Sequence, residues 1–481
     1  MSVLLNATNA TSRTENGALQ YHTTGSACLD FFSKVSSCRE DTDVAKYLFN
    51  SALAEDPELA MRILLWAHDI RGGAGERQVF RDLTIEFLND PTWTTRTKCD
   101  LLSKIPELGR WDTPFLCAKA AKQKILFVHV LQMATQALYA ENALCAKWIP
   151  RRGEIFNRLC GYLGITPKQL RKLLKKVTGI TVERLMSENR WTEINYEHVP
   201  SVAMSRYRNA FLRHDGERFR EYLNRVENGE SKINTSVVFP HDVIRNCETN
   251  PAAAQAQWDN LPNYADTRDN ILCMADVSGS MCERVSGCIT AMDIALGLAI
   301  YIAERNHGIF KDEAIIFSAE PLMVKLQGNV TQKMRQLKNA MDPCNTNFMA
   351  ALRLILRAAV KNKIPAADMP TKLLVLSDMQ FDYSHNMTIY REIVARYHRA
   401  GYRVPEIVFW NLSARYTDGQ MVTRDTKGTC SISGYSPAIL KEVLKGSIPN
   451  PYTIMLNTVG DPKYALPVHT HIRGVDTTSA H

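Results

Sequence analysis

The sequence contains none of the usual signatures of a secreted, zinc-binding or membrane-spanning protein. Its twelve cysteines are scattered, with no Cys-x-x-Cys pair and no histidine at zinc-like spacing. The N-terminus has no basic segment followed by an apolar core, as a secretory signal peptide would have. No apolar run approaches the roughly 20 residues that span a bilayer. We therefore expect a cytoplasmic protein with reduced thiols and no membrane partner.

Common catalytic motifs are also missing. No Gly-x-Ser-x-Gly elbow occurs, and "VSGSM" at 277–281 lacks the first glycine. The glycine-rich "RGGAGER" at 71–77 differs from the Gly-x-x-x-x-Gly-Lys-Ser/Thr phosphate loop, and no predicted strand precedes it. Its glycines could let backbone amides meet a phosphate, but a tight turn between two helices is the alternative. We expect that the chain is not an enzyme.

What is present is an ordinary globular composition with a mild positive charge. The 481 residues are 45% apolar and 22% charged, with a net charge of +8. A chain of this length suggests about two to four domains. The charge permits an acidic partner such as nucleic acid but does not require one.

Hydrophobic patterning divides the chain into a helical part and an alternating part. Before residue 250, apolar residues recur three and four apart, which predicts helices, with a break at Pro57. Many short helices joined by Pro and Gly turns favour a HEAT-like α-helical solenoid or ring. Further on, apolar runs such as "ILCMADV" and "KLLVLSD" alternate with helical segments, which is typical of a doubly wound α/β sheet. The expected division is a flexible tail over 1–25, a helical domain over 26–250, a connector over 251–268, an α/β domain over 269–457 and a tail over 458–481.

Oxygen-bearing side chains follow the predicted strands of the second half. Asp276, Ser278 and Ser280 come at the end of one apolar strand, Thr346 precedes a helix, and Asp378 follows another strand. Doubly wound sheets bind ligands beyond the carboxyl ends of their strands. Carboxylates and hydroxyls without sulfur or imidazole suit Mg²⁺, Mn²⁺ or Ca²⁺. The alternative is that Asp276 and Ser278 only cap the next helix.

This set of residues resembles the metal-ion-dependent adhesion site of von Willebrand factor A domains, which is built from Asp-x-Ser-x-Ser, a later Thr and a later Asp. The resemblance implies a von Willebrand factor A domain in the second half. It implies that Ser278, Ser280 and Thr346 contact a divalent ion, and that Asp276 and Asp378 act directly or through water. A remaining coordination position would accept an acidic protein ligand.

A strongly basic segment lies in the helical part. In "PKQLRKLLKKVTG", one face of the predicted helix carries the apolar residues Leu170, Leu173, Leu174 and Val177. The opposite face carries only basic residues: Lys168, Arg171, Lys172, Lys175 and Lys176. Like charges one turn apart repel, so such a helix gains from an anionic partner, most simply a phosphate backbone. A solvated surface helix is the alternative.

Neighbouring segments add further candidates for RNA contact. Lys147, Arg151 and Arg152 precede the basic helix, and Arg206 and Arg208 follow it. The interleaved aromatic residues of "SRYRNAF" could stack on bases, although packing in a core is the alternative.

Many short motifs together resemble one uncharacterised family. These motifs include "RGGAGERQVFR", "IPELGRWD", "MSENRWTEINYEHVPSVAMSRYRNAFLRHD", "NTNF" and "SGYSPAILK". The sequence resembles a family found in plants, protists and large viruses or phages, which joins a helical region to a von Willebrand factor A domain. That family is more distantly similar to the Ro autoantigen, or TROVE, proteins. The resemblance to Ro proteins implies a helical ring that binds small or single-stranded RNA.

The sequence therefore predicts a non-enzymatic RNA-binding scaffold, or ribonucleoprotein component, with a divalent metal site for an acidic protein ligand. The alternative is a metal-dependent protein interaction or assembly module, viral in one version, that binds no nucleic acid.

Overall fold

The computed structural model describes residues 11–14, 17, 19–227, 239–249, 251–263, 269–317, 320–340, 347–381, 387–413, 419–444 and 446–470. The chain forms two compact units. The sheet unit comprises residues 1–41 and 182–458, and the helical unit comprises residues 42–181 and 459–481. Each unit combines two separate parts of the chain, whereas the division expected from the sequence is linear.

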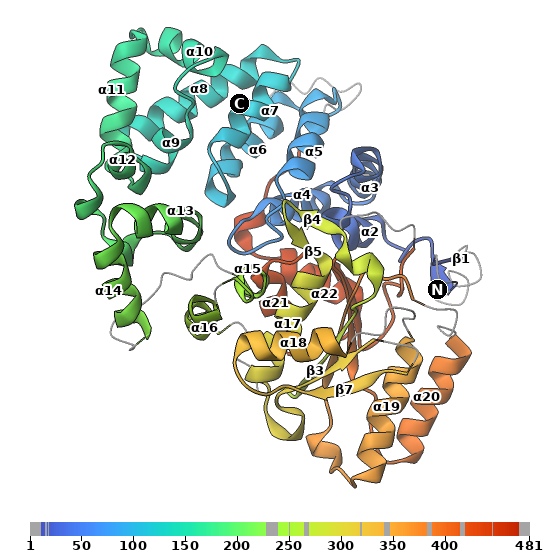
Figure 1. The fold of residues 1–481 in the computed structure, drawn as a ribbon. Helices are drawn as coiled ribbons and strands as arrows, with labels where there is room; N and C mark the ends of the chain where they lie inside the picture. The colour runs from blue at the N-terminus through green and yellow to red at the C-terminus, as the bar shows by residue number, and fades with distance from the viewer. Residues whose placement is uncertain are drawn as a thin grey trace. The chain divides into compact units, whose positions relative to one another are not determined.

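The helical unit packs each helix against its near neighbours in sequence (Figure 1). Its helices are α3 Thr42–Glu55, α4 Pro57–His68, α5 Gln78–Asn89, α6 Thr95–Leu108, α7 Asp112–Ala120, α8 Lys124–Tyr139, α9 Ala143–Trp148, α10 Glu154–Leu163 and α11 Pro167–Thr178. Asp56 caps α4 by accepting the Leu59 N–H, and Pro57 occupies the first turn, where its fixed φ suits a helix. The helical character of this region is confirmed, and its closure into a HEAT-like ring stays a prediction.

The sheet unit contains a six-stranded sheet in the order β10-β9-β8-β3-β6-β7. Its strands are β3 Ile271–Ala275, β6 Glu313–Ile316, β7 Leu322–Lys325, β8 Lys372–Ser377, β9 Glu406–Asn411 and β10 Thr429–Ser433. Only β7, at one edge, runs antiparallel to its neighbour within this sheet. Every residue of β3 and β8 is buried, as expected of central parallel strands that read as continuous apolar runs.

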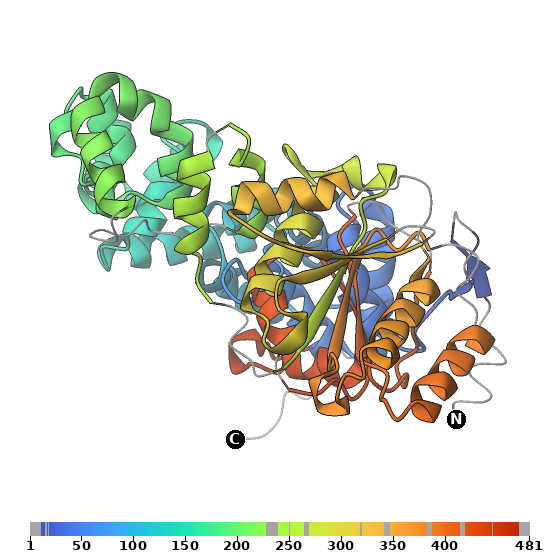
Figure 2. The same cartoon turned by 60° about the horizontal axis from the view of Figure 1, so that its bottom comes forward.

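Helices cover both faces of this sheet. They are α17 Ala291–Arg305, α18 Val330–Asn339, α19 Phe348–Lys361, α20 Met387–Arg399, α21 Pro437–Val443 and α22 Pro451–Val459. Figure 2 shows the orange helices α19 and α20 on one side of the sheet and the olive α17 on the other. Phe348 of α19 and Tyr397 of α20 pack into one core with Val375 of β8 and Phe409 of β9. The prediction of strand-helix alternation around a largely parallel sheet is confirmed.

The described part of the N-terminal segment is attached to the sheet unit. Strand β1 Thr11–Arg13 pairs with β2 Leu19–Tyr21. Tyr21 and Gln420 exchange backbone hydrogen bonds of 2.9 and 2.7 Å. The helix that follows, α2 Ala27–Lys34, packs against β10. The described residues of the expected 1–25 tail therefore contact the sheet unit, which explains why this segment groups with residues far along the chain.

An aromatic cluster holds together the helices that precede the sheet. These are α12 Val182–Ser187, α13 Ser201–His214 and α14 Gly216–Glu227. Tyr196 lies between Phe211, Phe219 and Tyr222, with ring centroids 5.0 to 5.7 Å away. The Tyr196 hydroxyl donates to Asp215 Oδ2 at 2.7 Å, which satisfies its polar end.

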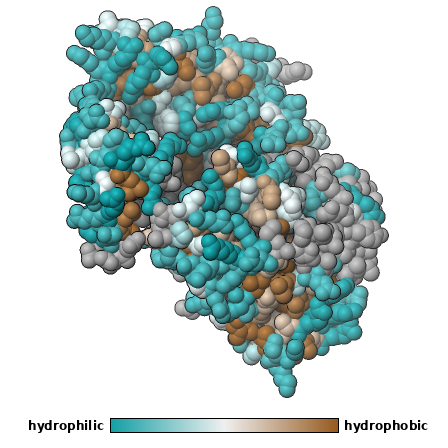
Figure 3. All heavy atoms as spheres, viewed as in Figure 1, coloured by the Kyte–Doolittle hydropathy of each residue, from teal (hydrophilic) through white to brown (hydrophobic). Residues whose placement is uncertain are grey.

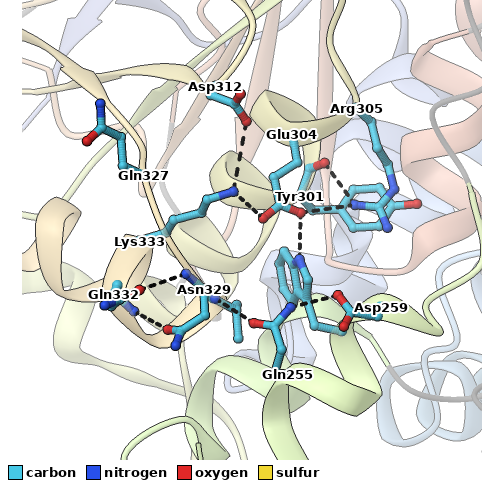
Figure 4. A network of polar contacts seen from close by, with 12 residues as sticks. Gln255, Asp259, Tyr301, Glu304, Arg305, Asp312, Gln327, Asn329, Gln332 and Lys333 are labelled. Atoms are coloured by element: carbon cyan, nitrogen blue, oxygen red, sulfur yellow. Dashed lines mark hydrogen bonds and ion pairs between the residues drawn. The ribbon is translucent and has the colours of Figure 1, made fainter. Parts of the chain in front are cut away.

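The segment expected to be a connector contains a packed helix. Helix α15 Pro240–Asn246 lies against α17, and α16 Pro251–Asp259 lies against α18. The indole Nε1 of Trp258 donates to Glu304 Oε2 at 2.6 Å, and Lys333 Nζ donates to Glu304 Oε1 at 2.7 Å (Figure 4). Gln255 Oε1 accepts the Val330 N–H at 2.8 Å. These bonds fix α16 to the helices that flank the sheet.

None of the described helices is both long enough and apolar enough to cross a membrane.

Candidate functional site

The predicted metal ligands begin at the carboxyl ends of two adjacent parallel strands. Strands β3 and β8 pair in register, with Ala275 opposite Leu376. Asp276 directly follows β3, and its N–H donates to the Leu376 carbonyl at 2.9 Å. Asp378 directly follows Ser377, the last residue of β8. The structure therefore brings Asp276 and Asp378 to the same edge of the sheet, as the sequence predicts.

Both carboxylates are buried and held by hydrogen bonds. Asp276 is fully buried, and Asp378 is only 7% exposed. The Ser377 hydroxyl donates to Asp276 Oδ2 at 2.7 Å, and the Ser278 N–H donates to Asp276 Oδ1 at 3.0 Å. Burial and the nearby Asp378 charge raise the pKa of Asp276 to about 6, against the opposing effect of these hydrogen bonds. Two acidic groups at one buried edge favour a cation between them.

The two predicted serine ligands lie side by side. The hydroxyls of Ser278 and Ser280 are 3.0 Å apart. Ser278 occupies the N-cap position of the short 3-10 helix Gly279–Cys282, but its side chain makes no capping hydrogen bond. The alternative that this serine only caps the following helix is therefore not supported. Thr346, the remaining predicted ligand, lies outside the described residues.

The composition of this cluster fits a hard divalent ion. Two carboxylates and two hydroxyls are oxygen ligands of the kind that Mg²⁺ and Ca²⁺ prefer. No group of three or more His, Cys, Asp or Glu side chains could hold a metal ion within the described ranges. A metal ion at this edge would therefore depend on the serine hydroxyls as well as on Asp276 and Asp378.

Two polar residues of this edge were not predicted as participants. Ser377 orients Asp276, and its hydroxyl also accepts the Met379 N–H at 3.0 Å. Asn411 ends β9 directly opposite Ser377, and its Oδ1 accepts the Ser413 N–H at 2.9 Å. The available signal was a polar residue at the end of an apolar strand, as in "LLVLS" and "VFWN".

Helix α11 has the exposed basic face that the sequence predicts. Leu170 and Leu174 are fully buried, and Lys168, Arg171, Lys172, Lys175 and Lys176 are all exposed. Hydrophilic residues cover most of the surface around α11 (Figure 3). Lys176 approaches Glu141 at 3.5 Å, whereas the described chain offers Lys168 and Lys172 no ion-pair partner.

Two of the predicted RNA contacts have structural partners within the helical unit. Arg151 Nη1 donates to the Ala146 and Ile149 carbonyls at 2.8 and 3.0 Å, and burial lowers the pKa of its guanidinium. Arg171 lies over the Phe156 ring and donates to the Arg151 carbonyl at 3.3 Å. Lys147 and Arg152 are exposed. The guanidinium of Arg151 thus stabilises the end of α9 Ala143–Trp148 as well as carrying charge.

The remaining two predicted contacts belong to the other unit. Arg206 and Arg208 lie on α13 of the sheet unit, where Arg206 is exposed and Arg208 is half-buried. Burial lowers the pKa of Arg208. Phe211 is fully buried in the aromatic cluster, and the Tyr207 ring packs against it at 6.3 Å. Phe211 is therefore a core residue and cannot stack on bases without unfolding.

The glycine-rich loop is a turn in which four consecutive amides, those of residues 71–74, donate to acceptors of the protein. Asp69 Oδ1 accepts the N–H groups of Arg71 and Gly72 at 2.8 and 3.0 Å. The Gly73 N–H donates to the Asp69 carbonyl, and the Ala74 N–H donates to the Trp66 carbonyl, both at 3.1 Å. The possibility that these amides bind a phosphate is not supported, because protein acceptors occupy them.

Two family models match different parts of the chain. The second half matches a domain of unknown function, DUF7788. That match spans residues 270–458, which contain the sheet and its carboxylate edge. A second domain of unknown function, DUF2828, matches residues 14–88 and 165–271. These matches support an uncharacterised family that joins a helical region to a sheet-containing domain.

Two individual proteins are similar over most of the chain. An uncharacterised protein of Acanthamoeba polyphaga mimivirus is 28% identical, with 97% of this chain and 90% of that protein covered. The crystal structure of the Deinococcus radiodurans Ro (RSR) protein aligns with 89% of this chain and 93% of that chain, at 14% identity and a TM-score of 0.36. A score at this level does not establish a shared fold.

Proposed function

We propose that the chain is a non-enzymatic binding scaffold with two activities. Its sheet unit would contain a von Willebrand factor A-type domain that holds Mg²⁺, or Mn²⁺ or Ca²⁺, for an acidic protein ligand. Its helical unit would bind RNA through the exposed basic face of α11. The observation that carries the first activity is the pair of buried carboxylates, Asp276 and Asp378, together with the adjacent Ser278 and Ser280 hydroxyls.

The residues of the sheet edge have separable roles in this proposal. Asp276 and Asp378 supply negative charge, and Ser278, Ser280 and Thr346 supply neutral oxygen ligands. Ser377 and the Ser278 N–H hold the Asp276 carboxylate by one oxygen each, which orients it before an ion arrives. A bound divalent ion would supply a Lewis-acidic position for a carboxylate of the partner.

Thermal melting and titration calorimetry with Mg²⁺ test the metal site. We expect Mg²⁺ to raise the melting temperature of the native chain relative to chelator, since an ion that binds only the folded state stabilises it. Asp276→Ala and Asp378→Ala should abolish that rise. Asp368→Ala removes an exposed carboxylate elsewhere in the sheet unit and should respond as the native chain does. Equal Mg²⁺ responses in native and Asp276→Ala protein would refute the site.

The RNA proposal rests on the uncompensated charge of α11. Lys168 and Lys172 are exposed and have no ion-pair partner in the described chain, and both lie on the face opposite to buried Leu170 and Leu174. Basic residues that meet phosphates release counterions, so affinity should fall steeply with salt. We assign the RNA contacts to the lysines rather than to Arg151 and Arg171, because those arginines also donate hydrogen bonds within the protein.

A charge-matched pair of quadruple variants tests RNA binding. The first variant carries Lys→Glu changes at Lys168, Lys172, Lys175 and Lys176. The control carries the same change at four exposed lysines of the sheet unit: Lys311, Lys361, Lys427 and Lys441. The first should weaken binding to single-stranded RNA at least tenfold and reduce the salt slope by about 3, at about 0.7 per lost phosphate contact. If both variants behave alike, binding reflects net charge only.

The alternative function, a metal-dependent protein interaction or assembly module without nucleic acid, makes a different prediction. Nuclease-treated native protein would then show no salt-sensitive RNA binding, while the Mg²⁺ response stays intact. That combination of results would favour the alternative.

A further inference from the structure

A groove lies at the edge of the sheet opposite to the carboxylate cluster. It has a volume of about 700 Å³ and is lined by the first residues of β8 and β9 and the loops beside them. β8 has six residues, so at about 3.3 Å per residue its first and last residues are about 17 Å apart. The groove is therefore a different site from the one formed by Asp276 and Asp378.

The floor of the groove contains a neutralised positive charge. Lys372, the first residue of β8, is only 1% exposed. Its Nζ lies 2.6 Å from Asp269 Oδ2 and 3.3 Å from the Leu444 carbonyl. Because a buried ammonium is costly unless it is paired, this lysine is occupied by the protein itself and is not available to a ligand.

Arg403, on the rim of the groove, differs from Lys372 because its charge is not paired within the described part of the protein. Its side chain is exposed, and the described residues provide it with neither an ion pair nor a hydrogen bond. Glu406, three residues further on, uses one carboxylate oxygen to accept the Ile448 N–H at 3.0 Å. Arg403 and Glu406 are separated by at most about 10 Å of chain, so a small molecule can contact both.

The groove is lined by both polar and apolar residues, and the hydroxyls of Thr371 and Ser447 add to its polar groups. Met369, Pro370 and Val404 line the groove together with the small side chains of Ala366 and Ala367. Met369 belongs to the core beside the sheet, and Val404 packs against that core. Clefts of this size that combine apolar surface with fixed polar groups are typical of sites for small organic ligands.

We propose that this groove binds a small amphipathic organic anion. Its carboxylate or phosphate pairs with the Arg403 guanidinium, whose planar fork suits both groups. Its apolar part lies against Met369 and Val404, and a hydrogen-bond donor of the ligand can reach Glu406. This site is independent of the proposed metal and RNA binding, since it shares no residue with either.

Fluorescent probes test the groove in the full-length chain. Anilinonaphthalene sulfonate has an apolar ring system and an anionic head, and phenylnaphthylamine has a similar ring system without the charge. We expect Arg403→Gln to weaken sulfonate binding at least fivefold and to leave binding of the neutral probe within twofold. Arg335→Gln removes an exposed arginine of α18 that does not line the groove and should bind both probes as the native chain does.

Two further arms locate the probe and identify the head group. Val404→Trp, or Ala367→Trp at the more exposed rim, should block both probes by filling the groove. Octanoate and octyl phosphate should displace the sulfonate probe, and octanol should not. The anion that displaces the probe at the lower concentration identifies the preferred head group, carboxylate or phosphate. The proposal is overturned if Arg403→Gln binds the sulfonate probe as tightly as native protein does. It is also overturned if every tryptophan variant that folds binds both probes as the native chain does.

Discussion

At the scale of single residues, Asp69 decides the chemistry of the glycine-rich turn. Its Oδ1 accepts two backbone N–H groups, and its Oδ2 accepts Lys463 Nζ and the Tyr464 hydroxyl, both at 2.9 Å. Burial would raise the pKa of Asp69, but the hydrogen bonds from Lys463, Arg71 and Gly72 outweigh burial and lower it. One carboxylate thus replaces the phosphate that a glycine-rich loop could otherwise accept.

Asp69→Asn should destabilise the helical unit in a pH-dependent way. The folded-state pKa of Asp69 is lowered from its ordinary value of 3.8. Its ionised form therefore contributes stability above pH 3.8, and that contribution is lost as pH falls through the lower folded-state value. Hydrogen bonds to charged groups contribute about 1.5–3 kcal/mol. We expect a clear loss of melting temperature at pH 7 that shrinks below pH 3.8, and a pH-independent loss would contradict this explanation.

A substitution at Gly73 tests the close packing of the same turn, and a substitution at Gly161 in a helix serves as the comparison. A Cβ at Gly73 would lie 1.8 Å from the Trp66 carbonyl oxygen, and a Cβ at Gly161 would meet no atom within 4 Å. Gly73→Ala should therefore destabilise the protein by at least about 1–3 kcal/mol, as overpacking does. Gly161→Ala, inside α10, should stabilise it by about 0.5–1 kcal/mol through helix propensity. Differential scanning calorimetry of both variants measures this; a neutral Gly73→Ala would show that the turn can shift.

At the scale of elements, α16 shows how a connector becomes part of a packed unit. "PAAAQAQWD" has no clear amphipathic pattern, yet Trp258 is only 2% exposed and donates to Glu304 of α17. Glu304 also accepts Lys333 of α18, and Lys333 approaches Asp312 at 3.9 Å (Figure 4). The position of this helix is therefore set by Trp258 and the Glu304 carboxylate it shares with Lys333, together with the hydrogen bond from the Val330 N–H to Gln255.

Trp258→Phe should destabilise the sheet unit because Glu304 loses a hydrogen bond of 2.6 Å. Loss of a hydrogen bond to a charged group costs about 1.5–3 kcal/mol. Trp93→Phe is the matched control, since the Trp93 Nε1 is buried and has no hydrogen-bond partner among the residues that the structure describes. Hydrogen exchange should increase over 251–259 in Trp258→Phe only. Equal exchange in the two variants would mean that apolar packing alone holds α16.

At the scale of the whole molecule, the two ends of the chain belong to opposite units. The N-terminal 41 residues group with the sheet, and residues from 459 onward group with the helices. In the helical unit, the His469 N–H donates to Thr97 Oγ1 at 2.9 Å, and the Thr94 N–H donates to the His469 carbonyl at 3.1 Å. The stability of the helical unit therefore depends on residues that follow the sheet in sequence.

Ending the chain at Thr458 should weaken the helical unit. The truncation removes Lys463 and Tyr464 from Asp69 and removes His469 from Thr97. Hydrogen exchange should rise around Asp69 and Thr97 and should change little in β3 and β8. A chain ending at Thr470 keeps these contacts and serves as the control. Unchanged exchange in the shorter chain would show that the helices are stable without this segment.

The sequence by itself determined the central strands of the sheet and the chemistry of their carboxyl ends. β3 and β8 are buried on both faces, so they read as continuous apolar runs, and Asp276 and Asp378 follow them directly. The short edge strand β7 has no fully buried residue. It therefore lacks the continuous apolar run by which the central strands were predicted, and the sequence did not reveal it. Only the tertiary structure decided that Ser377 holds Asp276, that Arg151 has structural partners, and that a groove opens beside Arg403. Those outcomes depend on contacts between residues far apart in the chain, and local periodicity contains no information about which distant partner each side chain meets.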